Sequence, residues 1–511
     1  MSYSIGTRFL RRVFRRYPAI LGVAAMLTGG CTTFEEWVHN GFKVGPKFEE
    51  PSATVSSAWI DANDKRIASE SPQGNDWWNV FGDPAIPALV ETAYRENLDL
   101  KTAGTRVLQS QAQRNIAVGN LFPQTQNAIG DYVHANIGNN LNVFGNPQAA
   151  FPNSLNIWAT GFNTSWELDF WGRFRRQIES SNADLGASLE GYHDALVTLT
   201  ADVVTNYVQI RTFQQRIVFA RRNVEIQKGS LRLAEARLAD GKATALDVKQ
   251  AKSILAQTES TIPPLAIGLR QANDRLCVLL GQSSWDLLPL FNDGPIPEVP
   301  PKAAVGIPAD LMQRRPDVRK ALRTAASQSA KIGIAEADFY PQLGVTGFVG
   351  FTSDDVATLF AGKSFTALVL PNFSWKILNY GRVLNNVRLQ DAKYQETVLQ
   401  YQQTVLAAGR EVEDALVAFL QYQLQAISLE ESVKAAEDSV ELVQAQYRGG
   451  LVDFNRVFTT QSQLVTQQDE LATARGNIAL SLISVYRALG GGWIPFENCS
   501  TPGTGVKEKG K

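Results

Sequence analysis

The sequence predicts a mainly α protein with a transmembrane β-barrel part, built as a tandem duplication. Three observations carry this prediction: a long seven-residue apolar repeat, its recurrence earlier in the chain, and four short strand-like stretches. With 511 residues, 44% of them hydrophobic, the chain is long enough to bury a large core.

The apolar repeat is clearest in the second half of the chain. Every seventh residue from Val398 to Tyr447 is apolar or aromatic, and a second such row starts at Tyr401. Two apolar positions in each heptad form the seam of a left-handed coiled coil. At about 1.5 Å per residue, this segment predicts a helix on the order of 75 Å long, which is more than a compact domain needs.

The same pattern occurs earlier in the chain. Moved back by 209 residues, the row meets only apolar residues between 189 and 238, and residues 166–173 match 375–382. Upstream, residues 120–124 match 338–342 at an offset of 218, so the first copy has a loop nine residues longer. Long duplicated units are typical of rings and arrays.

Composition and motifs exclude several classes of function. The net charge of −1 lacks the basic excess of a nucleic-acid-binding protein. The three Cys and three His residues show no metal-ligand spacing and no disulfide framework, and no catalytic motif is present. These residues are Cys31, Cys277, Cys499, His39, His134 and His193.

The N-terminus predicts a targeting segment over residues 1–30. Five arginines precede a short apolar stretch that is too short to span a bilayer, and small residues then lead into Cys31. Residues 27–31 resemble a bacterial lipobox, although Leu27 lies one position further from the cysteine than usual. We expect lipid on Cys31, and the alternative is an ordinary cleavage site. Thr32 favours sorting to the outer membrane.

The four strand-like stretches lie near residues 125–135, 156–168, 343–353 and 364–375. Each has about the length that a tilted strand needs to cross a bilayer. In the last stretch one face carries Phe365, Ala367, Val369, Phe373 and Trp375, which we expect to face lipid. The alternative is two hairpins of a soluble domain, with Trp166 and Trp375 in its core.

A sheet with open edges cannot lie in lipid, so several protomers must complete one barrel. Two protomers would give eight strands with a filled interior, and three would give twelve strands around a lumen.

Several motifs together resemble the TolC/OprM family of outer-membrane efflux channels. They are the lipobox, Val44-Gly-Pro, Trp77-Trp78 with Phe81-Gly-Asp-Pro84, Asn97-Leu-Asp-Leu, the two Phe-Pro or Tyr-Pro ends, and Leu489-Gly-Gly-Gly-Trp493. The similarity covers the chain up to about Trp493 and is closest to the lipoprotein, NodT-like branch that serves resistance-nodulation-division pumps. It implies a homotrimer with a 12-stranded barrel on a long helical barrel and a mixed equatorial belt.

The expected organisation has five parts after the signal peptide. Residues 31–85 form a lipid-anchored tether and equatorial segment, and residues 86–285 form the first repeat. Residues 286–308 form a linker in the equatorial zone, residues 309–494 the second repeat, and residues 495–511 a disordered tail. Two prolines, Pro263 and Pro264, are expected to break the returning helix of the first copy.

The resemblance also assigns site residues. The helix–turn–helix tips would contact a periplasmic adaptor, although local chemistry would explain them equally well as plain turns. The expected contacts are Arg237, Gly241, Leu246, Asp247, Arg448, Gly450 and Asp453. The expected membrane-interface aromatics are Trp158, Trp166, Phe365, Phe373 and Trp375.

The expected aperture departs from the family pattern. Related channels carry aspartates on the helix after the second tip, where this chain has Arg456 and Thr459. Asp247 and Asp453 are the remaining carboxylates, so we hypothesise that Arg456 pairs with one of them, within or between protomers, to close the pore.

The predicted function is passive conduction of drugs or other small toxic compounds across the outer membrane. It needs no catalytic residue, metal or cofactor beyond lipid on Cys31. The alternatives are an exit duct for type I protein secretion and, more remotely, a secreted coiled-coil scaffold or adhesin. Residues 357–364 also fit a loose phosphate-loop pattern, but an alternating strand follows where a helix is needed.

Overall fold

The computed structural model of the chain describes residues 34–68, 76–136, 154–291 and 294–493. The chain divides into two compact units, each assembled from three stretches. The first unit comprises Met1–Pro51, Leu108–Ala187 and Ala321–Gln400, and the second comprises Ser52–Val107, Ser188–Lys320 and Tyr401–Lys511.

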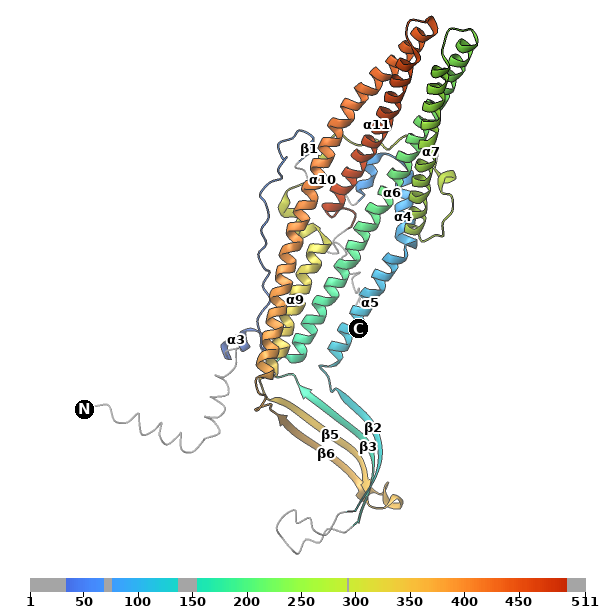
Figure 1. Ribbon diagram of the computed structural model, residues 1–511. Helices are drawn as coiled ribbons and strands as arrows, with labels where there is room; N and C mark the ends of the chain where they lie inside the picture. The colour runs from blue at the N-terminus through green and yellow to red at the C-terminus, as the bar shows by residue number, and fades with distance from the viewer. Residues whose placement is uncertain (1–33, 69–75, 137–153, 292–293, 494–511) are drawn as a thin grey trace, which may run out of the picture. The chain divides into compact units, whose positions relative to one another are not determined.

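One order of elements occurs twice, namely a helix, two strands, a long helix and a returning helix (Figure 1). The first copy consists of α5 (Leu98–Gly119), β2 (Thr125–Asn136), β3 (Ser154–Leu168), α6 (Arg173–Ala239) and α7 (Ala245–Leu279). The second consists of α9 (Pro316–Ala337), β5 (Gln342–Ser353), β6 (Phe365–Ser374), α10 (Arg382–Gly449) and α11 (Phe454–Ala488). This recurrence confirms the predicted duplication.

The two copies also agree in backbone detail. Glycines 209 positions apart adopt the same left-handed conformation, which is strained for residues with a Cβ atom. The pairs are Gly172 and Gly381 (φ 83° and 78°), Gly241 and Gly450 (71° and 77°), and Gly281 and Gly490 (69° and 73°). The equivalence of the copies therefore extends to individual turns.

The four strands form one antiparallel sheet in the order β2-β3-β5-β6. Their bounds lie within two residues of the expected ones. The central pair joins the two copies, because β3 belongs to the first and β5 to the second, with Ser165 opposite Thr346. The outer edges of β2 and β6 have no strand partner among the described residues.

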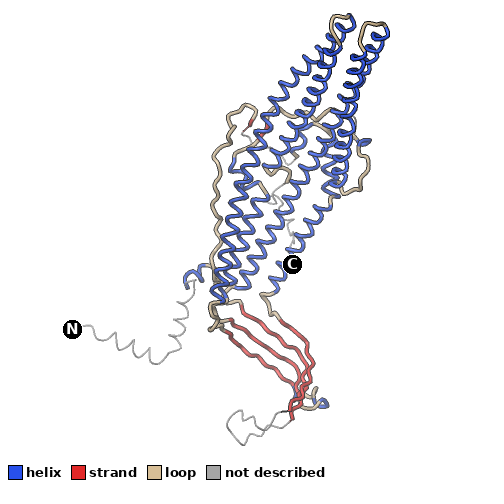
Figure 2. The backbone as a smooth tube through the Cα atoms, viewed as in Figure 1, coloured by secondary structure: helices blue, strands red, loops and turns tan. Residues whose placement is uncertain are grey.

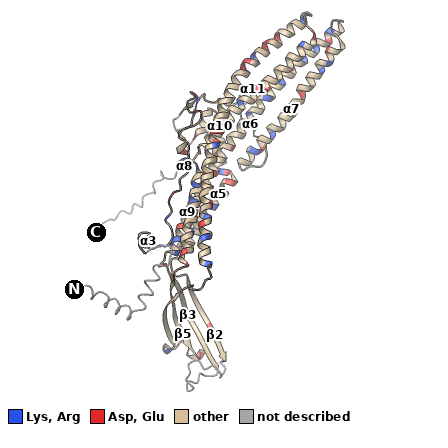
Figure 3. Cartoon of the chain, turned by 60° about the vertical axis from the view of Figure 1, so that its left-hand side comes forward, with Lys and Arg blue, Asp and Glu red and all other residues tan. Residues whose placement is uncertain are grey.

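The register separates a mainly apolar, aromatic face from a mixed face that carries both acidic residues of the strands, because opposed residues of an antiparallel sheet share a face. One face carries Tyr132, Trp158, Phe162, Trp166, Val345, Val349, Phe351, Phe365, Val369 and Phe373. The other face is mixed: it carries the polar residues Asn127, Asp131, Asn163, Ser165, Glu167, Thr346, Thr366 and Asn372, together with Ile129, Val133, Leu155, Ile157, Phe348, Leu368 and Leu370. Residues coloured as charged are sparse along the strands in Figure 3. The register of all four strands therefore identifies a face suited to contact with lipid. In β2, β3 and β5 taken singly, the alternation of apolar and polar residues is weak.

The long helices follow the predicted heptads. Along α10 the seam residues Val405, Val412, Phe419, Val433 and Val440 are all buried. Figure 2 shows α6 running beside α7 and α10 beside α11, with both turns at the same end. Burial along a seven-residue row is the packing expected for a coiled-coil seam.

The expected break at Pro263 and Pro264 is wrong, because α7 continues as one helix through both residues. A proline removes one helical hydrogen bond and crowds the preceding turn. Here the helix is buried on both sides of the pair, at Thr258 and at Leu265. Tertiary packing therefore outweighs the local preference, as it often does for helix propensity.

Short elements of the second unit form the mixed belt. Strand β1 (Ile67–Ala68) pairs in parallel with β4 (Ala303–Ala304) of the linker between the copies. The remaining described elements of the belt are η1 (Trp77–Phe81), α4 (Ala85–Glu96), η2 (Leu288–Leu290), η3 (Pro308–Asp310) and α8 (Leu311–Arg314). The N-terminal segment docks on α10, where the backbone N–H of Ile60 donates to Glu413 and Arg66 donates to the Leu420 carbonyl. Helix α3 (Phe34–His39) belongs to the first unit.

Candidate functional site

The two tips have the same turn chemistry. In the first, Gly241 is left-handed and the N–H of Lys242 donates to the Arg237 carbonyl at 2.8 Å. In the second, Gly450 is left-handed and the N–H of Leu451 donates to the Gln446 carbonyl at 3.0 Å. Both are Schellman-type helix ends, which explains the glycine in each tip.

The next helices start with matching caps. The Thr244 hydroxyl accepts from the N–H of Asp247, whose carboxylate completes a capping box. In the second tip, the Asp453 carboxylate accepts from the N–H of Arg456 at 3.1 Å. Such caps satisfy N–H groups that the helix leaves unbonded.

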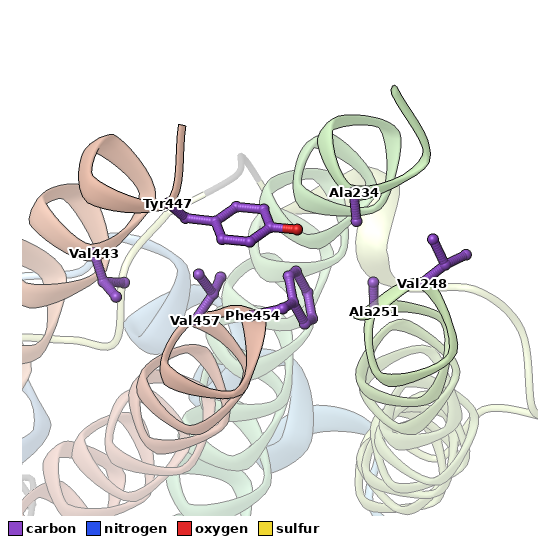
Figure 4. Packing of buried hydrophobic residues seen from close by; sticks show 7 residues of the cluster. All are labelled: Ala234, Val248, Ala251, Val443, Tyr447, Phe454 and Val457. Carbon is purple, nitrogen blue, oxygen red and sulfur yellow. The ribbon is translucent and has the colours of Figure 1, made fainter. Parts of the chain in front are cut away.

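A small apolar cluster lies just behind the turns and joins both hairpins (Figure 4). The Tyr447 and Phe454 rings meet edge to face with centroids 5.4 Å apart. Its members are Ala234, Val248, Ala251, Val443, Tyr447, Phe454 and Val457. The cluster holds the two tips together within one protomer.

Arg237 adds a polar clamp to this cluster. Its guanidinium donates to the carbonyls of Tyr447 and Arg448, the latter at 2.9 Å, and lies 4.8 Å from the Tyr447 ring centroid. A cation at the C-terminus of α10 is favoured by the helix dipole. Burial, together with the nearby Asp247 carboxylate, raises the pKa of the Tyr447 hydroxyl. The end of α6 is thereby tied to the end of α10.

The aperture candidates are only partly brought together. Asp247 and Asp453 are engaged as caps, and the Thr459 hydroxyl donates to the Asn455 carbonyl at 3.0 Å. Arg456 is exposed, and no ion pair within the described residues joins it to Asp247 or Asp453. The version of the latch within one protomer is therefore not formed here.

The sequence reasoning missed a polar row on α6. It lies one position before each seam residue, and each member contacts another long helix. The row is Asp202, Gln209, Arg216, Asn223, Ser230 and Arg237. Its heptad spacing is visible in the sequence, but attention to the apolar seam alone passes over it.

Partners of this row come mainly from the second copy. Arg216 forms two bonds to Asp469 at 2.7 and 2.9 Å, and the Asn223 amide donates to Gln468 at 2.8 Å. Closer to the tip, Gln461 donates to the Ser230 hydroxyl at 2.7 Å. Buried polar contacts of this kind specify register in coiled coils, so the row aligns the first hairpin with the second.

The expected interface aromatics lie on the sheet and at its base. The rings of Trp158 and Tyr132 pack together with their centroids 4.3 Å apart. The side chains of Phe365 and Phe373 lie on the apolar face and are 57% and 74% exposed. Trp166 donates to the Leu121 carbonyl, and Trp375, just beyond β6, donates to the equivalent Phe339 carbonyl. The two tryptophans thus fix the strand–helix junctions of the two copies in the same way.

Several sequence predictions lie outside the described residues, namely Cys31 with its leader, most of the first loop, Cys499 and the expected tail. Cys277 is a buried free thiol. Within the described ranges no group of three or more His, Cys, Asp or Glu residues could hold a metal ion. The expectation that a strand and not a helix follows the loose phosphate-loop pattern is confirmed, because residues 362–364 form a single 3-10 turn followed by β6.

Hydropathy adds one finding: in the described part of the chain, no helix combines the length and apolar character needed to span a bilayer.

Comparison with known proteins identifies the family. The family described as Outer membrane efflux protein matches residues 89–282 and 307–491, which is more than half of the chain. The chain belongs to the outer membrane efflux protein family. Its match falls in two segments, one in each copy.

Relatives of this efflux channel span nearly its whole length. It is 28% identical over 480 residues to the toluene efflux pump outer membrane protein TtgC of Pseudomonas putida, covering 93% of this chain and 95% of the relative. It is 25% identical over 457 residues to the cation efflux system protein CusC of Escherichia coli, covering 89% and 96%. The solved outer-membrane channel OprN has 30% identity and a TM-score of 0.81, covering 88% of this chain and 100% of that one.

Membership fixes the assembly. The protein is an outer-membrane efflux channel that extends into the periplasm and works as a homotrimer with a periplasmic adaptor and an inner-membrane resistance-nodulation-division pump. Four strands from each of three protomers form one 12-stranded barrel on a helical barrel. Of the sizes left open by the strand count, the trimer with a lumen is correct.

Proposed function

We propose that the channel conducts organic toxic compounds, such as drugs, detergents and phenolics, from its pump to the outside. One observation carries the role as a duct, namely a sheet with one mainly apolar face, one more polar face that carries both acidic residues of the strands, and two open edges. In a closed barrel this arrangement presents the apolar face to lipid and the polar face to a lumen. A passive duct needs no catalytic residue, because the pump supplies the energy.

The nature of the cargo is supported by the relatives and by composition. TtgC is named for toluene and CusC for cations. Copper(I) and silver(I) prefer soft thioether and thiolate ligands, but this chain has only three Met and three Cys residues. We therefore favour organic molecules over soft cations.

Complementation of a deletion strain tests this proposal. Cells that carry the adaptor and pump should regain tolerance to phenolics and detergents, with no change in tolerance to silver. Restored silver tolerance alone would indicate a cation exporter. Restored secretion of a polypeptide without any change in tolerance would favour the type I secretion duct.

We also propose that the tips are the adaptor contact, through the seven residues expected from the sequence. Leu246, next to the first turn, is 63% exposed, and Leu451 in the second turn is 79% exposed. Exposed apolar side chains at both turns favour a protein partner. Leu246→Glu should leave trimers intact and reduce tolerance to substrate, whereas Leu424→Glu, exposed on α10 away from the turns, should not.

Two further assignments remain proposals. The lipid anchor is Cys31, supported by the lipobox-like segment and by an outer membrane lipoprotein among the relatives, SilC. Closure of the aperture uses Arg456 between protomers, supported by its exposure next to the Asp453 cap. The five-part organisation stated above is the domain scheme that we propose, with its boundaries at residues 85, 285, 308 and 494.

A further inference from the structure

The sheet contains one complete junction between the two copies, formed by β3 and β5. Its two edge strands, β2 and β6, can each form one side of a second junction between protomers. Strand β3 of the first copy pairs with β5 of the second, whereas the edges of β6 and β2 are free in the described chain. In a closed trimer, β6 of one protomer must meet β2 of the next. Strands β2 and β5 are the first strands of their copies, and β3 and β6 are the second. Both the internal junction and the subunit junction therefore join a second strand to a first strand, and the internal junction serves as the template for the other.

The correspondence between strands follows from their pairing. Ser165 of β3 is equivalent to Ser374 of β6, 209 residues later, and these residues pair with Thr125 of β2 and Gln342 of β5. Thr125 and Gln342 therefore occupy equivalent places in the ladder at an offset of 217, one residue less than the offset of 218 that residues 120–124 and 338–342 show just before the strands. At the internal junction Ser165 lies opposite Thr346, four residues after Gln342. The equivalent partner of Ser374 is then Ile129, four residues after Thr125.

We propose that the barrel closes in this register, with Ser374 of each protomer opposite Ile129 of its neighbour. The ladder then continues with Phe373 opposite Gly130, Asn372 opposite Asp131, Pro371 opposite Tyr132, and Leu370 opposite Val133 of the neighbouring protomer. Apolar-face residues of β6 meet apolar-face residues of β2 throughout, which a shift by one residue would destroy.

Side-chain shapes at the free edges fit this register. The Phe373 ring is 74% exposed, and a Cβ atom on Gly130 would meet nothing within 4 Å. An aromatic side chain opposite a glycine covers the exposed backbone. At the equivalent internal position, Thr164 lies opposite Gly347, again a glycine under a larger side chain.

A second contact between the two copies, at the base of the sheet, also predicts an equivalent contact between protomers. Trp171 of the first copy stacks on Tyr340 of the second with ring centroids 4.4 Å apart, and donates to the Pro341 carbonyl at 2.8 Å. The equivalents are Tyr380 and Phe122, whose side chains are 91% and 61% exposed. Tyr380 stacks on Phe122 of the neighbouring protomer, and this contact covers two large exposed rings.

Disulfide trapping tests the register. Directly opposed residues have Cβ atoms about 4.5–5.5 Å apart and diagonal ones about 7–8 Å, whereas a disulfide needs about 3.5–4.5 Å. In a chain with Cys499→Ser, we expect N372C/D131C to give covalent dimers and trimers on oxidation, about tenfold above the single-cysteine variants. The matched control N372C/V133C shares the same face but is shifted by two residues.

A second pair guards against a local folding defect in the first. L370C/V133C follows the same register, and L370C/D131C is its shifted control. The inference is overturned when a shifted control cross-links better than its matched pair. It is also overturned when trimers of normal size form but neither matched pair exceeds the single-cysteine variants.

The ring contact is tested by a double-mutant cycle on the temperature at which trimers dissociate. Tyr380→Ala and Phe122→Ala should each lower it by a few degrees, and the double variant should lower it no further than the larger single effect. Leu378→Ala, 79% exposed two residues away, should change nothing. Additive effects of the two alanines would contradict the stack.

Discussion

Gln227 stands out at the scale of single residues, because it is 1% exposed on α6 and neither its amide nitrogen nor its amide oxygen is hydrogen-bonded in the described chain. A buried polar group without a partner costs about 1–3 kcal/mol. Gln461 of α11 is buried to a similar degree, at 2% exposed, and its amide oxygen is also unbonded, but its amide nitrogen donates to Ser230. These two buried glutamines are therefore expected to differ in their contribution to the free energy of unfolding.

This contrast gives a matched prediction. Gln227→Leu should raise the free energy of unfolding by about 1–3 kcal/mol, because it removes an unpaired buried amide. Gln461→Leu should lower it, because it removes the 2.7 Å hydrogen bond from the Gln461 amide to Ser230. Denaturant unfolding of purified protein measures both, and destabilisation by Gln227→Leu of the same size as by Gln461→Leu would contradict this reading.

In the first unit, the segment of residues 43–45 is held in place with the help of Glu179. Arg176, itself buried, donates to the carbonyls of Val44 and Gly45 and to the Glu179 carboxylate, which also pairs with Lys43. Burial favours the neutral acid, but the hydrogen bond from Lys43 and the charge of Arg176 outweigh it and lower the pKa of Glu179 from its ordinary 4.5. The ionised carboxylate therefore holds the segment.

The pH dependence follows from the sign of this shift. A lowered pKa in the folded state gives stability that is complete above about pH 4.5 and is lost as the pH falls through the folded pKa. For this partly exposed group we expect about 0.5–1 kcal/mol. A spin label at the exposed Lys47 should become mobile below pH 4.5 in the parent and be mobile already at pH 7 in Glu179→Gln. Equal mobility of the two at pH 7 would count against it.

At the scale of elements, the sequence predicted the strands, the long helices and the tips, because each leaves a local signature. Heptads mark the helices, and Gly241 with Thr244 marks a turn. It failed at Pro263 and Pro264, where burial of α7 overrides a local rule. It named Arg237 as a tip residue but missed its clamp on the end of α10, whose carbonyls lie more than 200 residues away. What local chemistry dictates was predictable, and what distant packing decides was not.

The aperture prediction also belongs to this scale. Arg456 is exposed at the start of α11, so in the closed trimer it is free to meet a carboxylate of a neighbouring tip. Arg456→Ala should raise single-channel conductance in planar bilayers, because it removes the proposed constraint between protomers. Lys249→Ala, exposed near the first tip, is the control. An unchanged closed state in Arg456→Ala would refute the latch.

At the scale of the whole molecule, duplication explains why the chain must assemble. One protomer supplies a four-stranded sheet with free edges and two helical hairpins, and repetition of the β3–β5 junction closes the ring. Heterologous contacts of this kind form closed rings when the rotation between copies closes. The strand count alone left two ring sizes open, because no single strand determines the curvature of the sheet.

Native mass spectrometry of the channel in mild detergent tests the central claim most directly, since it counts the chains in one particle. The account predicts a single species of three chains, each of 56.1 kDa for the full sequence, less the proposed leader and plus the proposed lipid. A monomer, a dimer or any ring other than a trimer would contradict it.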